Sequence, residues 1–265
     1  MSELSVESIK AALGTVWVGQ CVVYYPAIGS TNDEAKRLAE TGAPEGTLII
    51  ADHQTAGRGR LERQWWSPPG SSLLLSLVFR PAFLSPHQAH RLTMVCSLAV
   101  CDAVAEVTGL AAAVKWPNDV LVDGRKVCGL LAELGIAGSQ LDYVVVGIGI
   151  NVNVDFEDDD LPVLMAPATS LKAEAGREVS RLAVLAAFVR YVEARYERLR
   201  AGALPHEEWQ ARLVTVGQEV QVTMPGRVLT GLATAVDADG ALLVQWPDGE
   251  VERVLAGDVT LRGDG

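Results

Sequence analysis

The chain has 265 residues, 49% of them hydrophobic, which is enough for one large core and a small second domain without disulfides or structural metals. Its 22 Lys and Arg residues are outnumbered by 33 Asp and Glu residues, giving a formal net charge of -11. This balance disfavours DNA as a partner, because nonspecific DNA binding depends on cations that neutralise phosphates.

The first part of the chain alternates apolar, β-branched segments with helical patterns, which predicts a sheet covered by helices. We expect strands at 47–51, 72–79 and 143–150. Two of these segments are apolar at nearly every position, so helices should cover both faces of the sheet.

Three helices are predicted. Thr31 to Glu34 fit a capping box that opens a helix through about Glu40, with Gly42 ending it. A second helix should begin at Ser85-Pro86 and end at Gly109, and a third should span about residues 181–200.

Beyond Gly217 the pattern changes to short strands, predicted at 219–224, 228–236, 241–246, 250–255 and 259–262. Tight turns separate them, at Pro225-Gly226, Asp237 to Gly240 and Pro247 to Gly249. Short strands with tight turns favour a small β-barrel. We therefore predict two domains, residues 1–214 and 215–265.

No apolar run approaches the ~20 residues of a membrane span, and residues 1–10 lack the basic and apolar segments of a secretory signal. The four cysteines are scattered, without metal-ligand spacing. We expect a cytoplasmic protein whose thiols are reduced and buried.

Residues 54–66 place Arg58, Arg60 and Arg63 in a loop that also holds Gly57 and Gly59, on a chain that is otherwise acidic. Arginine presents a planar fork of donors that stays charged, and glycine lets backbone N–H groups approach a phosphate closely. The loop therefore predicts an anion site.

A second motif is Lys115-Trp116-Pro117-Asn118-Asp119, followed by Gly124-Arg125-Lys126. Pro117 cannot donate to a central ladder, so the strand should be interrupted there and expose Asn118 and Asp119. The Gly124 turn then returns Lys126 to the same region. This arrangement fits a site for a nucleotide phosphate and its magnesium, and it equally fits a solvated hairpin.

Two further segments are ambiguous. The segment Gly147 to Asn153 resembles part of a dinucleotide fingerprint but lacks the third glycine and the later acidic residue, so a Rossmann fold is not favoured. Gly29 to Asn32 supply small polar side chains at a helix start, as caps or as ligands. We expect the acidic loop 157–160 to be solvated, and no histidine receives a role; His87 and His90 should lie on the surface.

Taken together, Gly57 to Arg60 followed by a tryptophan, Lys115 to Asp119, Arg125-Lys126 with Gly129, and Gly147 to Asn151 resemble biotin protein ligases in order and spacing. The resemblance covers residues 28 to 262. It implies the α/β (α+β) fold shared with lipoate ligases and class II aminoacyl-tRNA synthetases, a mixed sheet with covering helices, followed by a small SH3-like C-terminal β-barrel. Repressor-type members carry a DNA-binding winged helix, which would need a further domain before Ser30, so we expect a monofunctional member.

By this resemblance, the protein attaches biotin to a lysine of a biotin carrier domain, of the acetyl-CoA carboxylase type, through biotinyl-5'-AMP, with Mg²⁺ accompanying ATP. The implied catalytic residues are Lys126, Arg58 and Arg60. The implied biotin-binding residues are Ser30, Thr31, Asn32, Gln54, Arg58, Gly59, Arg60, Lys126 and Gly129, with Gly129 to Ala132 as an apolar wall. The implied nucleotide-binding residues are Arg63, Trp65, Asn118, Asp119 and Asn151, and Asp119 is the candidate for contact with Mg²⁺.

One departure from the family pattern is Leu61-Glu62, where many relatives have a small or basic residue followed by glycine. We expect the arginine loop to be mobile before biotin binds, since its arginines have no partners evident in the sequence, and to close over the adenylate. A lipoate or octanoate ligase is the nearest alternative function, and a ligand-sensing module and a transcriptional regulator are two others. The carrier would dock near Arg125 or on the barrel, and the protein would be a monomer or a homodimer.

Overall fold

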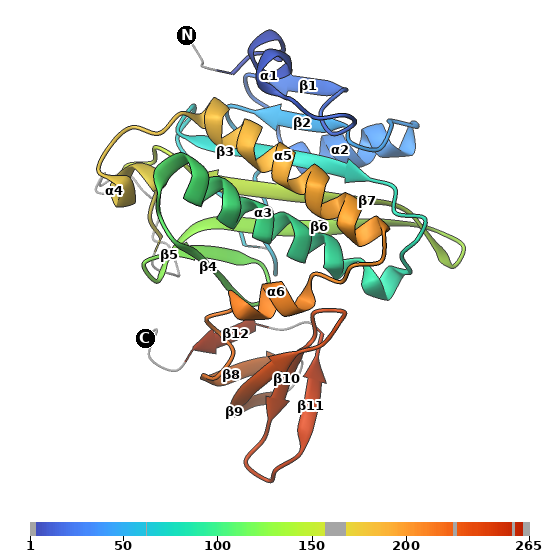
Figure 1. The fold of residues 1–265 in the computed structure, drawn as a ribbon, viewed down its shortest axis with the longest axis vertical. Helices are drawn as coiled ribbons and strands as arrows, with labels where there is room; N and C mark the ends of the chain where they lie inside the picture. Colours follow the sequence, from blue (N-terminus) through green and yellow to red (C-terminus); the bar gives the residue numbers. More distant parts are fainter. Residues whose placement is uncertain (1–3, 62, 157–167, 225–226, 256–257, 262–265) are drawn as a thin grey trace.

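The computed structural model describes residues 4–61, 63–156, 168–224, 227–255 and 258–261. It has a helix-covered sheet with a second, smaller sheet below it (Figure 1). The helices are α1 Val6–Ala12, α2 Thr31–Glu40, α3 His90–Thr108, α4 Leu171–Ala175, α5 Arg181–Arg200 and α6 His206–Ala211, with a 3₁₀ turn, η1, at Pro86–Gln88. The strands are β1 Val22–Tyr25, β2 Leu48–Ala51, β3 Ser72–Phe79, β4 Ala112–Lys115, β5 Asp119–Val122, β6 Arg125–Ala137, β7 Gln140–Asn151, β8 Glu219–Met224, β9 Arg227–Val236, β10 Leu242–Gln245, β11 Val251–Val254 and β12 Asp258–Leu261.

The large sheet has seven strands in the order β1-β2-β3-β7-β6-β5-β4. Strands β1 and β2 are parallel, and the remaining neighbours are antiparallel. The predicted mixed α/β fold is therefore confirmed. Strands β5, β6 and β7 follow one another in sequence and in space, which brings the second and third sequence motifs onto adjacent strands.

Helices cover both faces of this sheet, as the apolar strands predicted. Strand β3 is buried at every position. Leu75 belongs to the main core with α3 and α5, whereas Val78 packs on the opposite face with Ala35 and Ala39 of α2. In Figure 1, α3 and α5 lie side by side across one face of the sheet. Burying a Leu or Val side chain in this way stabilises the fold by about 1.5–3 kcal/mol.

The C-terminal strands form a five-stranded antiparallel sheet in the order β11-β10-β9-β8-β12, in the region predicted as an SH3-like barrel. The chain reaches this sheet beside β4, where Val114 N donates to Arg212 O (2.8 Å) and Val214 N donates to Val114 O (2.9 Å). The edge strand β4 of the large sheet is thus tied to the segment that leads into the C-terminal sheet.

Several local predictions need correction. The capping box at Thr31 to Glu34 is wrong: Ser30 is the N-cap, without a side-chain cap bond, and Thr31 lies inside α2. Ser85-Pro86 opens the 3₁₀ turn η1, and α3 begins only at His90. Cys21 is only half-buried, while the other three cysteines are buried. The acidic loop predicted at 157–160 lies outside the described residues.

His90 is a further correction, because its ring does not lie on the surface. It packs edge-on against Trp209 at 5.5 Å between centroids, and burial lowers the pKa of His90 to about 4. Among the described helices, none combines the length and the apolar character needed to cross a membrane.

Candidate active site

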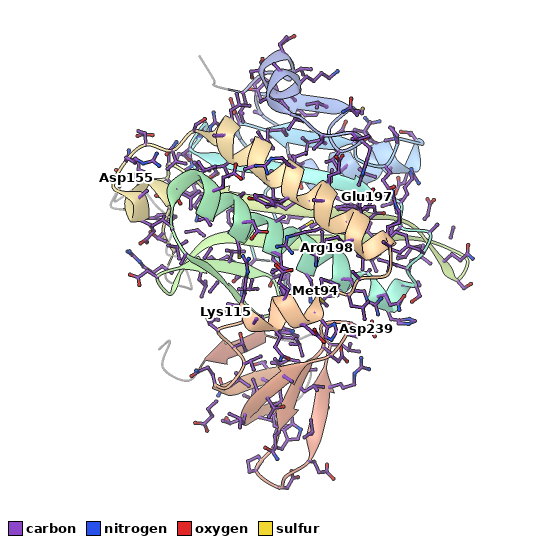
Figure 2. All side chains as sticks on the ribbon, viewed as in Figure 1. Met94, Lys115, Asp155, Glu197, Arg198 and Asp239 are labelled. Atoms are coloured by element: carbon purple, nitrogen blue, oxygen red, sulfur yellow. The ribbon has the colours of Figure 1, made fainter. Side chains whose placement is uncertain are left out.

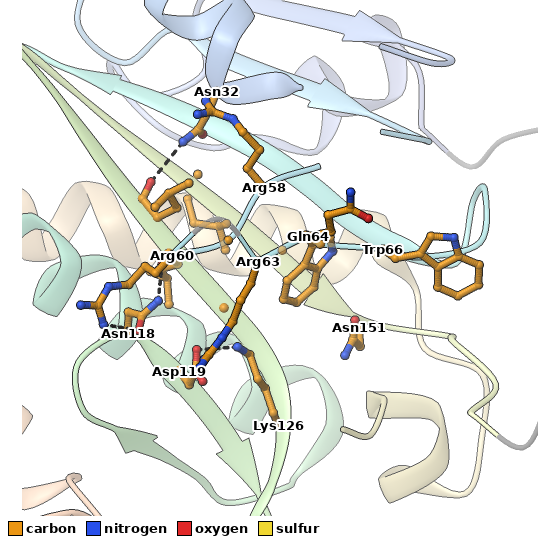
Figure 3. Close-up of a pocket in the computed structure, with 18 of the residues that line it drawn as sticks. Asn32, Arg58, Arg60, Arg63, Gln64, Trp66, Asn118, Asp119, Lys126 and Asn151 are labelled. Carbon is orange, nitrogen blue, oxygen red and sulfur yellow. Dashed lines mark hydrogen bonds and ion pairs between the residues drawn. The ribbon is translucent and has the colours of Figure 1, made fainter. Parts of the chain in front are cut away.

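One cavity of about 380 Å³ collects all of the predicted site residues except Ala132 of the predicted apolar wall. The loop 54–66, the start of α2 and strands β5 to β7 supply its walls (Figure 3). The predicted residues that line it are Ser30, Thr31, Asn32, Gln54, Arg58, Gly59, Arg60, Arg63, Trp65, Asn118, Asp119, Lys126, Gly129 and Asn151. The long-range fold therefore joins four sequence motifs into a single site.

The polar end of the cavity is built around the start of α2. Gln54 Oε1 accepts hydrogen bonds from Thr31 N (2.7 Å) and Thr31 Oγ1 (3.0 Å), so Gln54 caps this helix from a distance in sequence. Ser76 Oγ donates to Asn32 Oδ1 (2.6 Å) and lies 2.8 Å from Thr31 Oγ1. The polar side chains are consequently fixed before a ligand arrives.

Glycines of β6 and β7 make room for two side chains above the sheet. A Cβ on Gly147 would lie 2.2 Å from Asn32 Oδ1, and one on Gly149 would lie 2.5 Å from Trp65 Cε2. A Cβ on Gly129 would lie 2.9 Å from Trp65 Cζ3. The segment that resembles a dinucleotide fingerprint is thus a flat strand that forms the floor of the cavity.

The guanidinium of Arg58 is engaged by two carboxylates. Its Nη2 lies 2.6 Å from Asp33 Oδ1 and 2.9 Å from Glu133 Oε2. Glu133 also pairs with Lys36 Nζ at 2.7 Å. Burial opposes ionisation of Glu133, but bonds from Lys36 and Asn32 and the charge of Arg58 outweigh it and lower the pKa of this carboxyl. Arg58 therefore has two acidic partners that were not evident from the sequence.

The other two arginines of the loop lie closer to the nucleotide motif. Arg60 Nη1 lies 3.3 Å from Asn118 Oδ1. In Figure 3, the side chain of Arg63 extends toward Asp119 and Lys126. The cationic groups that the loop presents to the interior of the cavity are those of Arg60 and Arg63.

Lys126 and Asp119 form an ion pair inside the cavity. Lys126 Nζ lies 2.7 Å from Asp119 Oδ1, and both side chains are about a quarter exposed, at 27% and 25%. The same Nζ lies 5.8 Å from the centroid of the Trp65 ring. The Gly124 turn returns the chain as predicted, since β5 and β6 are antiparallel neighbours.

Trp65 and Asn151, which the family resemblance assigns to a nucleotide, place an indole ring and a carboxamide in the wall of the cavity. Asn151 is buried at the end of β7, and its Nδ2 donates to Thr169 O (3.1 Å). Trp65 Nε1 is buried without a hydrogen-bond partner among the described residues. A flat aromatic ring beside an amide suits the recognition of a purine base.

Several residues of the site escaped the sequence analysis. Asp33, Lys36, Glu133 and Ser76 form the polar network around Arg58 and Asn32. Ser76 and Glu133 interrupt otherwise apolar strand segments, and that was the available signal. Of the predicted wall, Gly129 to Leu131 line the cavity, whereas Ala132 lines a neighbouring cavity of about 180 Å³. The described residues contain no group of three or more His, Cys, Asp or Glu that could hold a metal.

Comparison with known proteins agrees with this geometry. Residues 24–151 match the biotin/lipoate A/B protein ligase family, and residues 215–262 match the biotin protein ligase C-terminal domain. The chain is 34% identical over 264 residues to the bifunctional ligase/repressor BirA of Bacillus subtilis, covering 98% of this chain and 79% of that protein. It is 35% identical over 237 residues to the biotin--[acetyl-CoA-carboxylase] ligase of Mycobacterium tuberculosis, covering 87% and 85%.

A solved structure of a biotin protein ligase is also similar to this chain. The biotin protein ligase of Aquifex aeolicus in complex with biotin and ATP superposes with a TM-score of 0.75 at 29% identity, covering 92% of this chain and 99% of that one. The fold and the cavity thus define a member of the biotin and lipoate ligase class. Within that class, the chain belongs to the biotin protein ligase family.

Proposed function

We propose that this protein activates biotin with ATP and transfers it to a lysine of a carrier domain. In the first step a biotin carboxylate oxygen attacks the α-phosphorus of ATP, and the bond to pyrophosphate breaks, leaving biotinyl-5'-AMP. In the second step the lysine amine attacks the acyl carbon, loses a proton and forms an amide, while AMP leaves. Relatives named as biotin ligases and a related complex with biotin and ATP support both substrates.

The observation that carries the proposal is the placement of two chemically different ends in one cavity. A neutral polar end, with Thr31, Asn32 and Gln54, is joined to a charged end, with Lys126 and Asp119. A buried cyclic urea needs each donor and acceptor paired. Because Gln54 Oε1 already caps α2, Gln54 would present its amide nitrogen to the ureido oxygen. A carboxylate and a triphosphate repel each other, so the other end must supply cations.

The residue roles follow from the geometry. Lys126 would hold the biotin carboxylate against the α-phosphate, and Arg60 and Arg63 would bind phosphate oxygens. Arg58 reaches Asp33 and Glu133, so its contribution to the pocket would come from its backbone. Trp65 and Asn151 would contact the adenine.

Mg²⁺ would enter with ATP as its counter-ion. The Asp119 carboxylate lies in the cavity, and a nucleotide-bound Mg²⁺ commonly takes one or two carboxylates in addition to phosphate oxygens. The residues present therefore fit a shared ion at the charged end. The described cysteines are all free, which fits a protein that works with ATP in the reducing cytoplasm.

Pyrophosphate release without an acceptor tests the first half of this proposal. Biotin, lipoate and octanoate are supplied in parallel with ATP and Mg²⁺. We expect release with biotin alone, in an amount close to one equivalent of enzyme if the adenylate stays bound. Release with lipoate or octanoate in place of biotin would contradict the assigned acyl substrate, and no release with any acid would contradict ligase activity.

A further inference from the structure

A turn of the C-terminal sheet, Asp237 to Gly240, lies directly against the nucleotide motif of the catalytic sheet. The indole of Trp116 is buried, with 2% of the residue exposed, and its Nε1 donates to Gly240 O (2.9 Å). Trp116 N donates to Thr215 Oγ1 (3.0 Å), so the same residue is held twice by the C-terminal region. Trp116 is the residue immediately before Pro117 and Asn118.

The turn packs closely against helix α3. Gly240 has a φ of +83°, and a Cβ added to it would lie 2.3 Å from His90 Cδ2 and 2.5 Å from Met94 Cε. Arg91 binds the turn from the same helix, with Nη2 donating to Asp239 Oδ1 at 2.9 Å. Figure 2 labels Met94 on α3 and Asp239 on the turn at this junction. Glycine at position 240 is therefore favoured by its positive φ, and a Cβ there would displace the His90 ring and the end of the Met94 side chain.

The turn is also stiff in itself. Asp237 Oδ1 accepts hydrogen bonds from Asp239 N (2.9 Å) and Ala241 N (3.0 Å), and Arg253 Nε donates to Asp237 Oδ2 (2.6 Å). Burial opposes ionisation of Asp237, but the bonds from Arg253 and the backbone outweigh it and lower its pKa. The carbonyl that receives the Trp116 indole thus has a fixed position.

A short series of contacts leads from Trp116 into the cavity. Asn118, two residues on, is locked to β6 because its Nδ2 donates to Leu130 O (2.6 Å) and its O accepts from Leu130 N (2.9 Å). Its Oδ1 meets Arg60. The next residue, Asp119, holds Lys126. A shift of Trp116 would therefore move the groups at the charged end, while leaving the start of α2 in place.

We propose that the Asp237–Gly240 turn is a positioning element for adenylate formation, and that Trp116 is the positioning residue through which it acts. The turn touches no reacting atom. It fixes the backbone of residues 116–119, and through it the alignment of Asn118 and Asp119 with ATP. The inference rests on the proposed function, since it assigns these two residues to the nucleotide.

The chain supplies a matched pair of variants for the test. Gly240→Ala adds a methyl group that meets His90 and Met94, whereas Gly249→Ala adds one where nothing lies within 4 Å. Both glycines lie in turns of the C-terminal sheet with positive φ, +83° and +91°, so both variants carry similar backbone strain. They differ in whether the turn can still dock.

Steady-state pyrophosphate release is measured for both variants with biotin and ATP varied separately. We expect Gly240→Ala to raise KM for ATP about tenfold and to lower kcat, with KM for biotin changed by less than about twofold. Gly249→Ala should match the parent in all three constants. Simple loss of folded protein would lower the signal without raising KM for ATP.

Two further variants keep the test specific. His90→Ala in the Gly240→Ala background removes the nearer of the two side chains that the new methyl group meets, and it should recover part of the affinity for ATP. Trp116→Phe keeps an aromatic ring but removes the indole donor, and it should reproduce the increase in KM for ATP; thermal unfolding and far-ultraviolet circular dichroism check that each variant is folded.

The possible outcomes separate this inference from the proposed function. If the parent enzyme releases pyrophosphate with biotin but Gly240→Ala and Gly249→Ala behave alike, the positioning role is wrong and the proposed function stands. A selective effect on KM for biotin would also overturn it. If the parent enzyme itself shows no biotin-dependent release, the proposed function fails first.

Discussion

In the proposed function, Lys126 is the residue on which adenylate formation depends most. Its ammonium is paired with Asp119 at 2.7 Å, inside the cavity and beside the Trp65 ring. The pairing restricts the orientation of the lysine before substrates bind. An incoming carboxylate or phosphate would then bind the same ammonium group. Preorganised cations of this kind are worth most where charge accumulates in the transition state.

Replacing Lys126 by Ala should therefore reduce the rate of adenylate formation by about 10²–10³-fold while leaving the fold intact. Rapid-quench measurement of a single turnover of pyrophosphate release reports this step directly. Lys172→Ala is the matched control, because Lys172 is 40% exposed and pairs with Glu178 outside the cavity. A Lys126→Ala enzyme as fast as the control would remove Lys126 from the reacting centre.

Some contacts in the site could be predicted from the sequence, and others could not. Lys126 and Asp119 could be paired in advance, because a glycine turn joins neighbouring strands. Glu133 could not be connected with Arg58, since the two residues meet only through the folding of the 54–66 loop over the sheet. The same applies to Gln54, which caps a helix that begins 23 residues earlier. Contacts of this kind depend on tertiary structure and have no local signature.

Among the helices and strands, the bounds were predicted best where the sequence has a continuous apolar or helical pattern. The predicted bounds of β3 and α5 agree with the structure at both ends, and both elements have continuous apolar or helical patterns. Strand β6 was not predicted, although the return of Lys126 was, because residues 125–137 mix apolar, charged and glycine positions. Two of the residues that break the strand pattern serve the cavity: Gly129 lines it, and Glu133 binds Arg58 beside it. The residues that build the site therefore made this strand hard to recognise from the sequence.

The packing of α3 against the C-terminal turn makes a prediction about pH. Burial, together with the charge of Arg60, holds the pKa of His90 at about 4, below its ordinary value of 6.5. Between these two values the unfolded chain binds a proton that the folded protein does not, so stability should fall as the pH is lowered from 6.5 toward 4. Above pH 6.5 the histidine is neutral in both states and contributes no slope.

Urea unfolding of the parent, His90→Asn and His87→Asn at several pH values measures this slope. The parent and His87→Asn should lose stability over the same pH range, since His87 is exposed, as the sequence predicted. His90→Asn should give a flatter profile, because it has no group to titrate. Equal slopes for all three proteins would show that His90 is protonated normally in the folded state.

At the scale of the whole molecule, the site was easier to predict than the architecture that builds it. Four motifs could be recognised because each combines unusual residue types, such as arginines with glycines or a proline between two strand patterns. Their convergence in one cavity follows from the sheet order β3-β7-β6-β5, which sets the motif-bearing strands side by side. The sheet order itself depends on long-range pairing and could be inferred only through the family resemblance.

The division of the chain into residues 1–214 and 215–265 remains our proposal, and the match of residues 215–262 to the C-terminal family supports it. The junction at Trp116 and Gly240 indicates that the two parts act together. The chain is acidic overall, yet five of its 22 Lys and Arg residues line the cavity, which suits the cavity to attract anionic substrates.

In the proposed reaction, biotin passes through an enzyme-bound adenylate on its way to a lysine. The enzyme is incubated with biotin, ATP and Mg²⁺, separated from free nucleotides by gel filtration, and mixed with an isolated biotin carrier domain without ATP; intact-protein mass spectrometry follows the carrier. We predict that the carrier gains one biotin and that an equal amount of AMP is released. A carrier that stays unmodified until ATP is added again would contradict the account.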